Sequence, residues 1–285
     1  MIGNEWRSNM LKATVERTLV VVAALLMCTK ASSAAELHPI VEVQDGYLFG
    51  AISDGKWIKA DETAKSIGDE TTYRVYGLTQ ALGDAKGGKP KPPEGLPCED
   101  TLTVSLSPKP ENGVIAIAAQ WNALPRKPKV IDTTQKVYVD VVRDFLETKE
   151  IKQPKVKIDS ILRVDLDGDG EEEVLISAAN YFAKADRVPM RSPAGSYSMV
   201  LLRRVVAGKV ETQLVAGEFH PKAYVSKEGS FDAPSIYKVI ATLDLDGDGK
   251  LEVVVGSNYY EGEEITIYRC DPKKVEALLS VACGS

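Results

Sequence analysis

Two short acidic segments contain the residues whose types and spacing could do chemistry. Residues 165–170 and 244–249 both have the pattern Asp-x-Asp-Gly-Asp-Gly, and a glutamate follows each after two further residues. In a tight loop, alternate side chains can converge on one point, while glycines adopt backbone conformations that other residues resist. We expect three aspartates, one backbone carbonyl and one glutamate to converge in each loop. These are Asp165, Asp167, Asp169, the Glu171 carbonyl and Glu173, and Asp244, Asp246, Asp248, the Lys250 carbonyl and Glu252.

Oxygen donors of this kind suit calcium, which takes roughly six to eight hard oxygen ligands, some of them water. Carboxylates crowded together repel one another unless a cation lies between them. A single such loop could be a solvated Asp-Gly turn, but two copies in register favour calcium at both. The EF-hand is excluded, because its loop requires a glutamate at the twelfth position, where this chain has Ile176 and Val255.

The acidic loops belong to a longer internal repeat. Residues 161–176 recur as 241–255, and the Asn-aromatic-aromatic triplet at 180–182 recurs at 258–260. Each copy predicts a strand, the acidic loop, a second strand, a connection and a hairpin, which is the four-stranded pattern of a propeller blade or a sandwich quarter. The hairpin turns are expected at Ala207-Gly208 and Asp271-Pro272, with extra residues of the first copy around 183–196.

This repeat resembles the FG-GAP repeats of integrin alpha chains and related bacterial proteins, in which such a loop joins two strands of a propeller blade. The resemblance covers about Ile158 to Cys283 and lacks the Phe-Gly and Gly-Ala-Pro signatures before each loop. It implies a mainly β chain with two four-stranded, propeller-blade-type repeats and a calcium ion in each loop.

The rest of the chain divides into a leader and two structural regions. Residues 36–127 predict an N-terminal β-rich region, and 128–285 a helix followed by the two repeats, with a Pro-rich, charged boundary at 125–129. Within the first region we expect strands over 72–76 and 101–106, and hairpins at Asp54-Gly55 and Asn112-Gly113. The helix is expected to be capped at 132–134 and to end at about Lys149, with its apolar stripe in the core.

Residues 1–35 have the features of a signal peptide. Basic residues precede an apolar run at 19–27, and small residues follow at 31–35, so cleavage is expected near Ala34 or Ala35. The run is shorter than the roughly 20 residues that span a membrane. A buried helix and a lipoprotein signal ending at Cys28 are the alternatives. The leader predicts a secreted or periplasmic protein.

The exported chain would keep three cysteines, which predicts one disulfide and one odd thiol. If the chain turns at 271–274, Cys270 lies opposite about Val275. Cys283 then lies about 26 Å farther along the strand, at roughly 3.3 Å per residue. That separation exceeds the limit of about 7 Å between the Cα atoms of a disulfide. We therefore expect Cys98 to pair with Cys283.

The remaining composition narrows the function. A net charge of −6 gives no basic footprint for nucleic acid. The chain has no zinc-protease, nucleophile-elbow, phosphate-loop or dithiol motif, and His220 of its two histidines is expected in a loop. We expect an exported calcium-binding β-repeat protein that serves as a non-catalytic interaction or adhesion module. Its partner would be a protein or a polysaccharide, with no nucleic acid and no membrane span. The alternative is an extracellular polymer hydrolase with a calcium-stabilised scaffold and a site in its N-terminal half.

Overall fold

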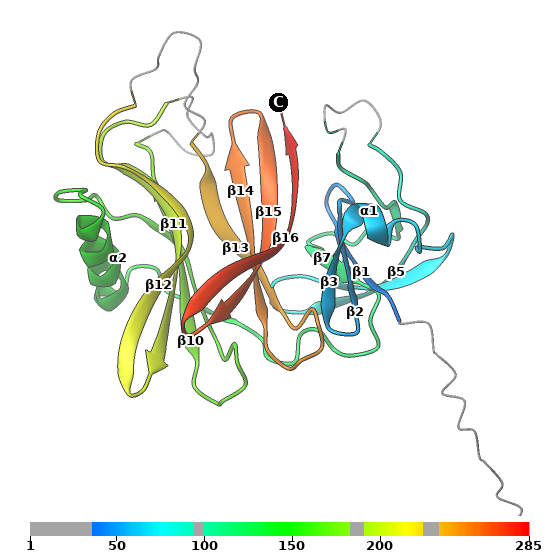
Figure 1. Cartoon of the computed structure of the whole chain (residues 1–285). Coiled ribbons are helices and arrows are strands. Elements are labelled where there is room, and N and C mark those ends of the chain that lie inside the picture. The colour runs from blue at the N-terminus through cyan, green and yellow to red at the C-terminus, as the bar shows by residue number, and fades with distance from the viewer. Residues whose placement is uncertain (1–35, 94–97, 99, 183–190, 225–233, 285) are drawn as a thin grey trace, which may run out of the picture. The chain divides into compact units, whose positions relative to one another are not determined.

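The computed structural model describes residues 36–93, 98, 100–182, 191–224 and 234–284 (Figure 1). The expected signal peptide and most of the expected insertion around 183–196 lie outside these residues. The described residues are mainly β, as the sequence predicts, with two helices and three antiparallel sheets. No helix in this part of the chain is long and apolar enough to cross a membrane.

The first repeat forms a four-stranded antiparallel meander, as expected. Its strands are β9 (Ile158–Val164), β10 (Glu173–Asn180), β11 (Ser196–Val206) and β12 (Lys209–His220). A fifth strand, β8 (Lys129–Ile131), pairs with β9 and completes the sheet order β12-β11-β10-β9-β8. The sequence did not predict β8, because its residues follow directly on the prolines of the boundary segment. The turn between β11 and β12 lies at Ala207 and Gly208, as expected, and both have positive φ.

The second repeat forms a separate four-stranded sheet in the order β13-β14-β15-β16. Its strands are β13 (Ile236–Leu243), β14 (Glu252–Tyr259), β15 (Gly262–Asp271) and β16 (Lys274–Gly284). The register of the last hairpin places Cys270 opposite Val275, as the sequence predicts. Residues 253–255 of β14 are all buried, because this strand packs against neighbouring sheets on both of its faces.

The N-terminal region forms a seven-stranded sheet in the order β3-β2-β1-β7-β4-β5-β6. Its elements are β1 (His38–Glu42), β2 (Leu48–Ser53), β3 (Lys56–Lys59), α1 (Ala60–Thr63), β4 (Thr71–Tyr76), β5 (Ala81–Gly87), β6 (Leu106–Ser107) and β7 (Ile115–Ile117). The hairpin at Asp54-Gly55 is confirmed by the pairing of β2 with β3.

The hairpin expected at Asn112-Gly113 is wrong. Strand β7 does not pair with residues 101–106, of which only Leu106 belongs to a strand; it pairs with β1 and β4. All three residues of β7 are buried, which fits its place in the middle of the sheet between β1 and β4. Within the preceding stretch, Thr103 makes only isolated bridges, to Tyr47 and to Lys91.

Helix α2 (Lys136–Thr148) confirms the expected helix but not its cap. The Asp132 carboxylate accepts hydrogen bonds from the Thr134 amide (2.8 Å) and hydroxyl (2.9 Å), which closes a local turn before the helix begins. The residue that precedes the helix, Gln135, makes no side-chain cap. Val142 and Leu146 are fully buried and pack against one face of the first-repeat sheet.

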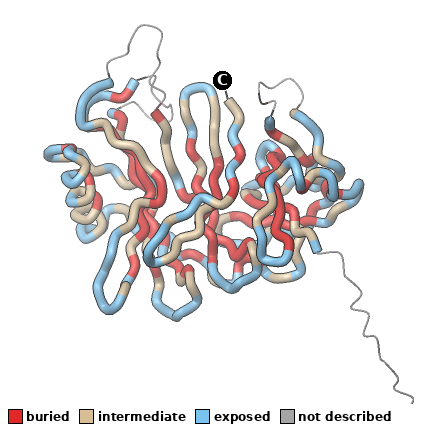
Figure 2. Tube along the Cα trace, in the orientation of Figure 1, coloured by how far each residue is buried: buried red, intermediate tan, exposed pale blue. Residues whose placement is uncertain are grey.

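The second repeat lies between the other two sheets. One core is shared by the two repeats and contains Leu175 and Val253; another is shared by the second repeat and the N-terminal sheet and contains Phe49 and Ile267. Helix α2 covers the remaining face of the first repeat (Figure 1). Buried residues gather where these layers meet, whereas the hairpin ends are exposed (Figure 2). Both faces of the first-repeat sheet are therefore covered, one by the second repeat and the other by α2.

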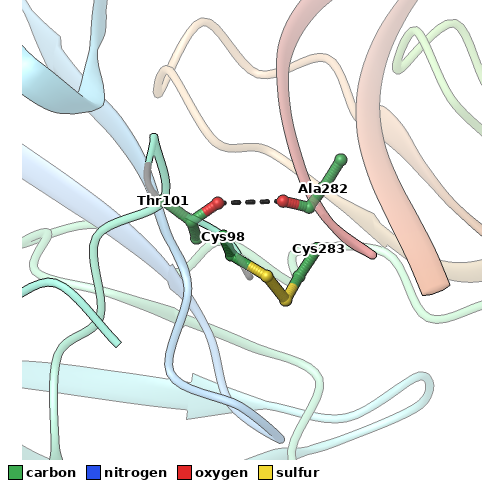
Figure 3. Close-up of a disulfide and its surroundings, with 4 residues drawn as sticks. All are labelled: Cys98, Thr101, Ala282 and Cys283. Carbon is green, nitrogen blue, oxygen red and sulfur yellow. Dashed lines mark hydrogen bonds between the residues drawn. A yellow bond between two sulfur atoms is a disulfide. The ribbon is translucent and has the colours of Figure 1, made fainter. Parts of the chain in front are cut away.

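The disulfide expected between Cys98 and Cys283 is present, with a Cα–Cα distance of 5.2 Å. Beside it, the Thr101 hydroxyl donates a hydrogen bond to the Ala282 carbonyl at 2.9 Å (Figure 3). These contacts fasten the N-terminal region to strand β16. Cys270 remains a free thiol, and burial raises its pKa to about 12.

Candidate metal centres

Each acidic loop connects the first two strands of its repeat, β9 to β10 and β13 to β14. The strand register places the glutamate of each loop beside the first aspartate. Glu173 pairs with Val164, the residue that precedes Asp165, and Glu252 pairs with Leu243, the residue that precedes Asp244. Carboxylates that are distant within the loop therefore meet at its base.

Three of the expected carboxylates converge in each loop. One oxygen from each member of a loop's set lies within 4.8 Å of the others. The sets are Asp165, Asp167 and Glu173 in the first loop, and Asp244, Asp246 and Glu252 in the second. This shared geometry indicates two acidic groups that could hold a metal ion.

The third aspartate of each loop lies outside its group. Asp169 and Asp248 are exposed, and each accepts a hydrogen bond at 2.8 Å from the backbone amide two residues later, that of Glu171 or Lys250. The structure thus gives these aspartates a role in shaping the turn. Their expected part in coordination, and that of the Glu171 and Lys250 carbonyls, stays a prediction.

Backbone amides fix the glutamates in the same way in both loops. One oxygen of Glu173 accepts the Leu166 amide at 2.8 Å, and one oxygen of Glu252 accepts the Leu245 amide at 2.9 Å. Both glutamates are buried, so these hydrogen bonds satisfy part of the polarity that burial would otherwise leave unpaired. Each glutamate is therefore held in place before any ion binds.

The first aspartates differ in how completely their oxygens are satisfied. Oδ1 and Oδ2 of Asp165 accept the amides of Gly168 (2.6 Å) and Gly170 (3.2 Å). In the second loop, Oδ2 of Asp244 accepts the Gly249 amide at 3.2 Å, whereas Oδ1 is shielded from solvent and the Gly247 amide beside the carboxylate does not reach full hydrogen-bonding geometry. Because Asp244 is only 6% exposed, this carboxylate oxygen is costly unless a cation meets it. The residues therefore fit a bound cation.

Burial and mutual repulsion disfavour ionisation of these carboxyl groups. Burial raises the pKa of Glu252 to about 8, and the Asp246 carboxylate adds to the effect. Burial also raises the pKa values of Asp244, Asp246 and Glu173, again with a contribution from neighbouring aspartates. A divalent cation would reverse this balance, because it favours the ionised form of every group around it.

Two arginines that no sequence pattern connects with the loops lie against them. Arg269 of β15 donates to Oδ2 of Asp246 at 2.6 Å, and its Nε lies 3.9 Å from Oε1 of Glu252. Arg126 donates to the Asp165 backbone carbonyl at 2.6 Å, with Nε 3.9 Å from Oδ2 of the same residue. Arg269 could have been found from the sequence, because it lies in the strand that was expected to follow β14 and pair with it. No local signal in the boundary segment points to Arg126.

The arginine at the same register of the first repeat makes a different contact. Val174 pairs with Arg203 as Val253 pairs with Tyr268, so Arg204 is the counterpart of Arg269. Arg204 donates to the Cys270 backbone carbonyl at 2.6 Å. The second loop therefore has a guanidinium group directly on one of its converging aspartates, whereas the register-equivalent group of the first repeat bonds a strand of the second repeat.

The two histidines contact other parts of the protein. His38 lies 2.9 Å from the Ala118 carbonyl, and its ring packs edge-on against Trp121. His220 was expected in a loop, and this prediction is wrong. It is the last residue of β12, where its Nε2 lies 3.3 Å from Oε1 of Glu218. That oxygen also accepts the Ser235 amide at 2.7 Å, which holds the end of the first repeat to the start of the second.

Comparison with known proteins identifies no family for this chain. No family model, no curated protein and no solved structure matches the chain. The resemblance to FG-GAP repeats therefore depends only on the sequence features described above.

Proposed function

We propose that this chain is an exported protein that binds calcium in its two acidic loops and acts as a non-catalytic interaction module for a protein or polysaccharide. The observation that carries the proposal is the repeated group of three carboxylates within 4.8 Å. The buried Oδ1 of Asp244 supports it independently, because no donor meets it in full hydrogen-bonding geometry and a buried carboxylate oxygen needs either a donor or a cation.

The donor chemistry favours calcium over other common ions. Every member of both groups is a carboxylate, and zinc and copper sites instead draw on histidine or cysteine. Magnesium also takes oxygen ligands, but it demands a small, nearly ideal octahedron and keeps several waters. Calcium accepts the irregular and larger shell that a loop with three carboxylates and nearby carbonyls can supply.

Calcium would act first on stability. The ligands of each group come from both ends of a loop that joins two paired strands, so they converge only when those strands pair. Binding is then linked to folding. An ion that binds only the native state at a free concentration 100 times its Kd stabilises that state by about 2.7 kcal/mol for each site.

Export is supported by the disulfide as well as by the leader sequence. Disulfides persist in oxidising compartments and are rare in the reducing cytosol. Extracellular calcium modules often bind with Kd values of roughly 0.1–1 mM, which suits compartments where calcium is abundant. Both acidic groups and the Cys98–Cys283 bond would then be formed under the same conditions.

An interaction role is supported by apolar side chains at the end of the β11–β12 hairpin. Val205 and Val210 pair across this hairpin, and they are 50% and 60% exposed. Strand β12 is also the last strand of its sheet. Edge strands and exposed apolar pairs are features through which β proteins contact partners.

Thermal unfolding with and without calcium tests the proposal. We expect a lower Tm in EGTA, recovery of the Tm with millimolar calcium, and poor recovery with magnesium. Combined Asp167→Ala and Asp246→Ala substitutions should remove the calcium effect. The matched control, Asp54→Asn in the β2–β3 turn, should retain it. Identical Tm values in EGTA and calcium, together with no heat of binding in calorimetry, would contradict the proposal.

A further inference from the structure

The segment of residues 121–126, here called the bridging segment, lies against both acidic loops. It follows β7 of the N-terminal sheet and precedes β8 of the first repeat. At its start, the Trp121 indole donates to the Asp244 carbonyl at 2.8 Å, and the Asp244 amide donates to the Ala123 carbonyl at 2.8 Å. The Trp121 ring also covers the second loop so closely that a Cβ at Gly247 would lie 3.2 Å from it.

At the other end of the bridging segment, one guanidinium group joins the two loops. Nε of Arg126 donates to the Asp165 carbonyl at 2.6 Å. One of its terminal nitrogens donates to the Gly249 carbonyl at 2.6 Å and to the Leu166 carbonyl at 3.3 Å. The planar, rigid fork of arginine can hold several acceptors at once, so the position of one loop constrains the other.

The loops are also bonded directly to each other. The Leu251 amide, just beyond the second loop, donates to the Leu166 carbonyl inside the first loop at 2.7 Å. Both leucines are buried in the core that the two repeats share. A change in the backbone of either loop therefore reaches the other through this hydrogen bond and through Arg126.

From these contacts we infer that the two metal sites are coupled, so that an ion in one loop strengthens binding in the other. Arg126 is the positioning residue of this coupling. The inference rests on the proposed function, because it requires both loops to bind calcium. An ion in the first loop fixes the carbonyls of Asp165 and Leu166, and Arg126 and Leu251 then hold the second loop close to its binding geometry. Couplings between sites are typically about 5- to 150-fold in affinity, and we expect about tenfold here.

Calorimetric calcium titrations of the wild-type protein and four variants measure the coupling. Asp167→Ala disables the first site and Asp246→Ala disables the second, so each variant reports the affinity of one loop alone. We expect the second ion to bind the wild-type protein about tenfold more tightly than an ion binds either single-loop variant. Arg126→Lys keeps the charge but not the fork, and it should bring the factor well below tenfold but not to one, because the Leu251–Leu166 hydrogen bond still joins the loops. The control Arg163→Lys, whose arginine pairs with Glu172 outside the acidic groups, should leave it unchanged.

Trp121 provides a second measurement that does not depend on the folding of the Arg126 variant. With Trp6 and Trp57 both replaced by phenylalanine, so that the emission comes from Trp121, we expect calcium to change that emission even when Asp246→Ala has disabled the second site beside it. The coupling is overturned if wild-type protein binds its two calcium ions with the affinities of the single-loop variants and calcium leaves the Trp121 emission of the Asp246→Ala protein unchanged. The proposed function would then still stand. An absence of any calcium binding would overturn both.

Discussion

The two acidic loops have the same sequence pattern and lie in different surroundings. In the first loop, the Asp165 side chain is 16% exposed and both of its oxygens accept backbone amides. In the second, the Asp246 side chain is 5% exposed and bonded to Arg269, while Asp244 has an unpartnered oxygen. The second loop is deeper because its repeat lies between two other sheets and because Trp121 covers its turn.

This difference shows that a ligand pattern does not by itself set the charge balance of a site. Arg269 supplies the second loop with an internal cation in direct contact with Asp246, and an entering ion must compete with it. In the first loop, Arg126 approaches the Asp165 carboxylate only to 3.9 Å and directs its hydrogen bonds at carbonyls. We therefore expect calcium to meet less competition in the first loop, and the second loop to depend less on an ion for its stability.

The largest expected effect that distinguishes the loops is the loss of an aspartate. Asp246→Ala removes a calcium ligand and the carboxylate to which Arg269 donates its hydrogen bond, so it should cost about 3–5 kcal/mol in saturating calcium. Asp167→Ala removes a ligand alone and should cost at most about 3 kcal/mol. In EGTA only the first variant should remain clearly less stable than wild type. Urea unfolding in both solutions measures these values, and equal costs for the two variants would remove the distinction between the loops.

Removal of Arg269, the cation inside the second loop, should lower stability without metal and raise calcium affinity with it. Arg269→Gln leaves the Asp246 and Glu252 carboxylates uncompensated, so we expect a loss of about 2 kcal/mol in EGTA. In calcium titrations, the same change should raise the affinity of the second loop severalfold, because the ion no longer competes with a guanidinium group. Arg204→Gln, at the equivalent register, serves as the comparison and should change that affinity less, because Arg204 bonds the Cys270 carbonyl and not a carboxylate of the second loop. An unchanged affinity in the Arg269 variant would show that Arg269 does not compete with the ion.

The pH dependence of stability in EGTA should separate the two glutamates. Folded Glu252 keeps its proton to a pKa of about 8, whereas the unfolded residue releases it near 4.5. Between these values the folded state binds more protons, so the free energy of unfolding should fall as the pH rises. Glu252→Gln should flatten this fall by an amount of the order of 2 kcal/mol between pH 5 and pH 8. The pKa of Glu173 is also raised by burial, but Glu173→Gln should flatten the fall less. Equal slopes in both variants would contradict this order.

The features that the sequence predicted are those that depend on local chemistry. Alternating aspartates and glycines determine a loop over a few residues, and the register of one hairpin excluded a bond between Cys270 and Cys283. Helix α2 followed from its apolar spacing, although Asp132 bonds Thr134 in a turn instead of capping the helix, and the short helix α1 was not predicted.

The features that the sequence did not predict depend on contacts between distant parts of the chain. Arg126 reaches Gly249 across 123 positions, and Trp121 reaches Asp244 across the same separation. Strand β7 was misassigned because its short apolar run fits a hairpin as well as a central strand; only its burial between β1 and β4 decides. Spacing along the sequence indicates which residues can bind an ion, whereas the packing of the layers decides which arginine lies against each loop.

The smallest expected difference between the loops concerns the first glycine of each turn. Gly168 and Gly247 both have positive φ, 81° and 75°, so alanine at either position should cost about 1–2 kcal/mol in backbone strain. At Gly168 the new Cβ would lie 3.4 Å from the Arg126 guanidinium, which is an ordinary van der Waals contact, whereas at Gly247 it would press on the Trp121 ring at 3.2 Å. Gly247→Ala should therefore be less stable than Gly168→Ala by about 1 kcal/mol. A matched pair isolates the strain, because a Cβ at Gly170 or Gly249 meets nothing within 4 Å, and alanine there should cost the same in both loops. If urea unfolding shows the Gly168 and Gly247 variants to be equally stable, the Trp121 ring yields without cost and does not account for the deeper burial of the second loop.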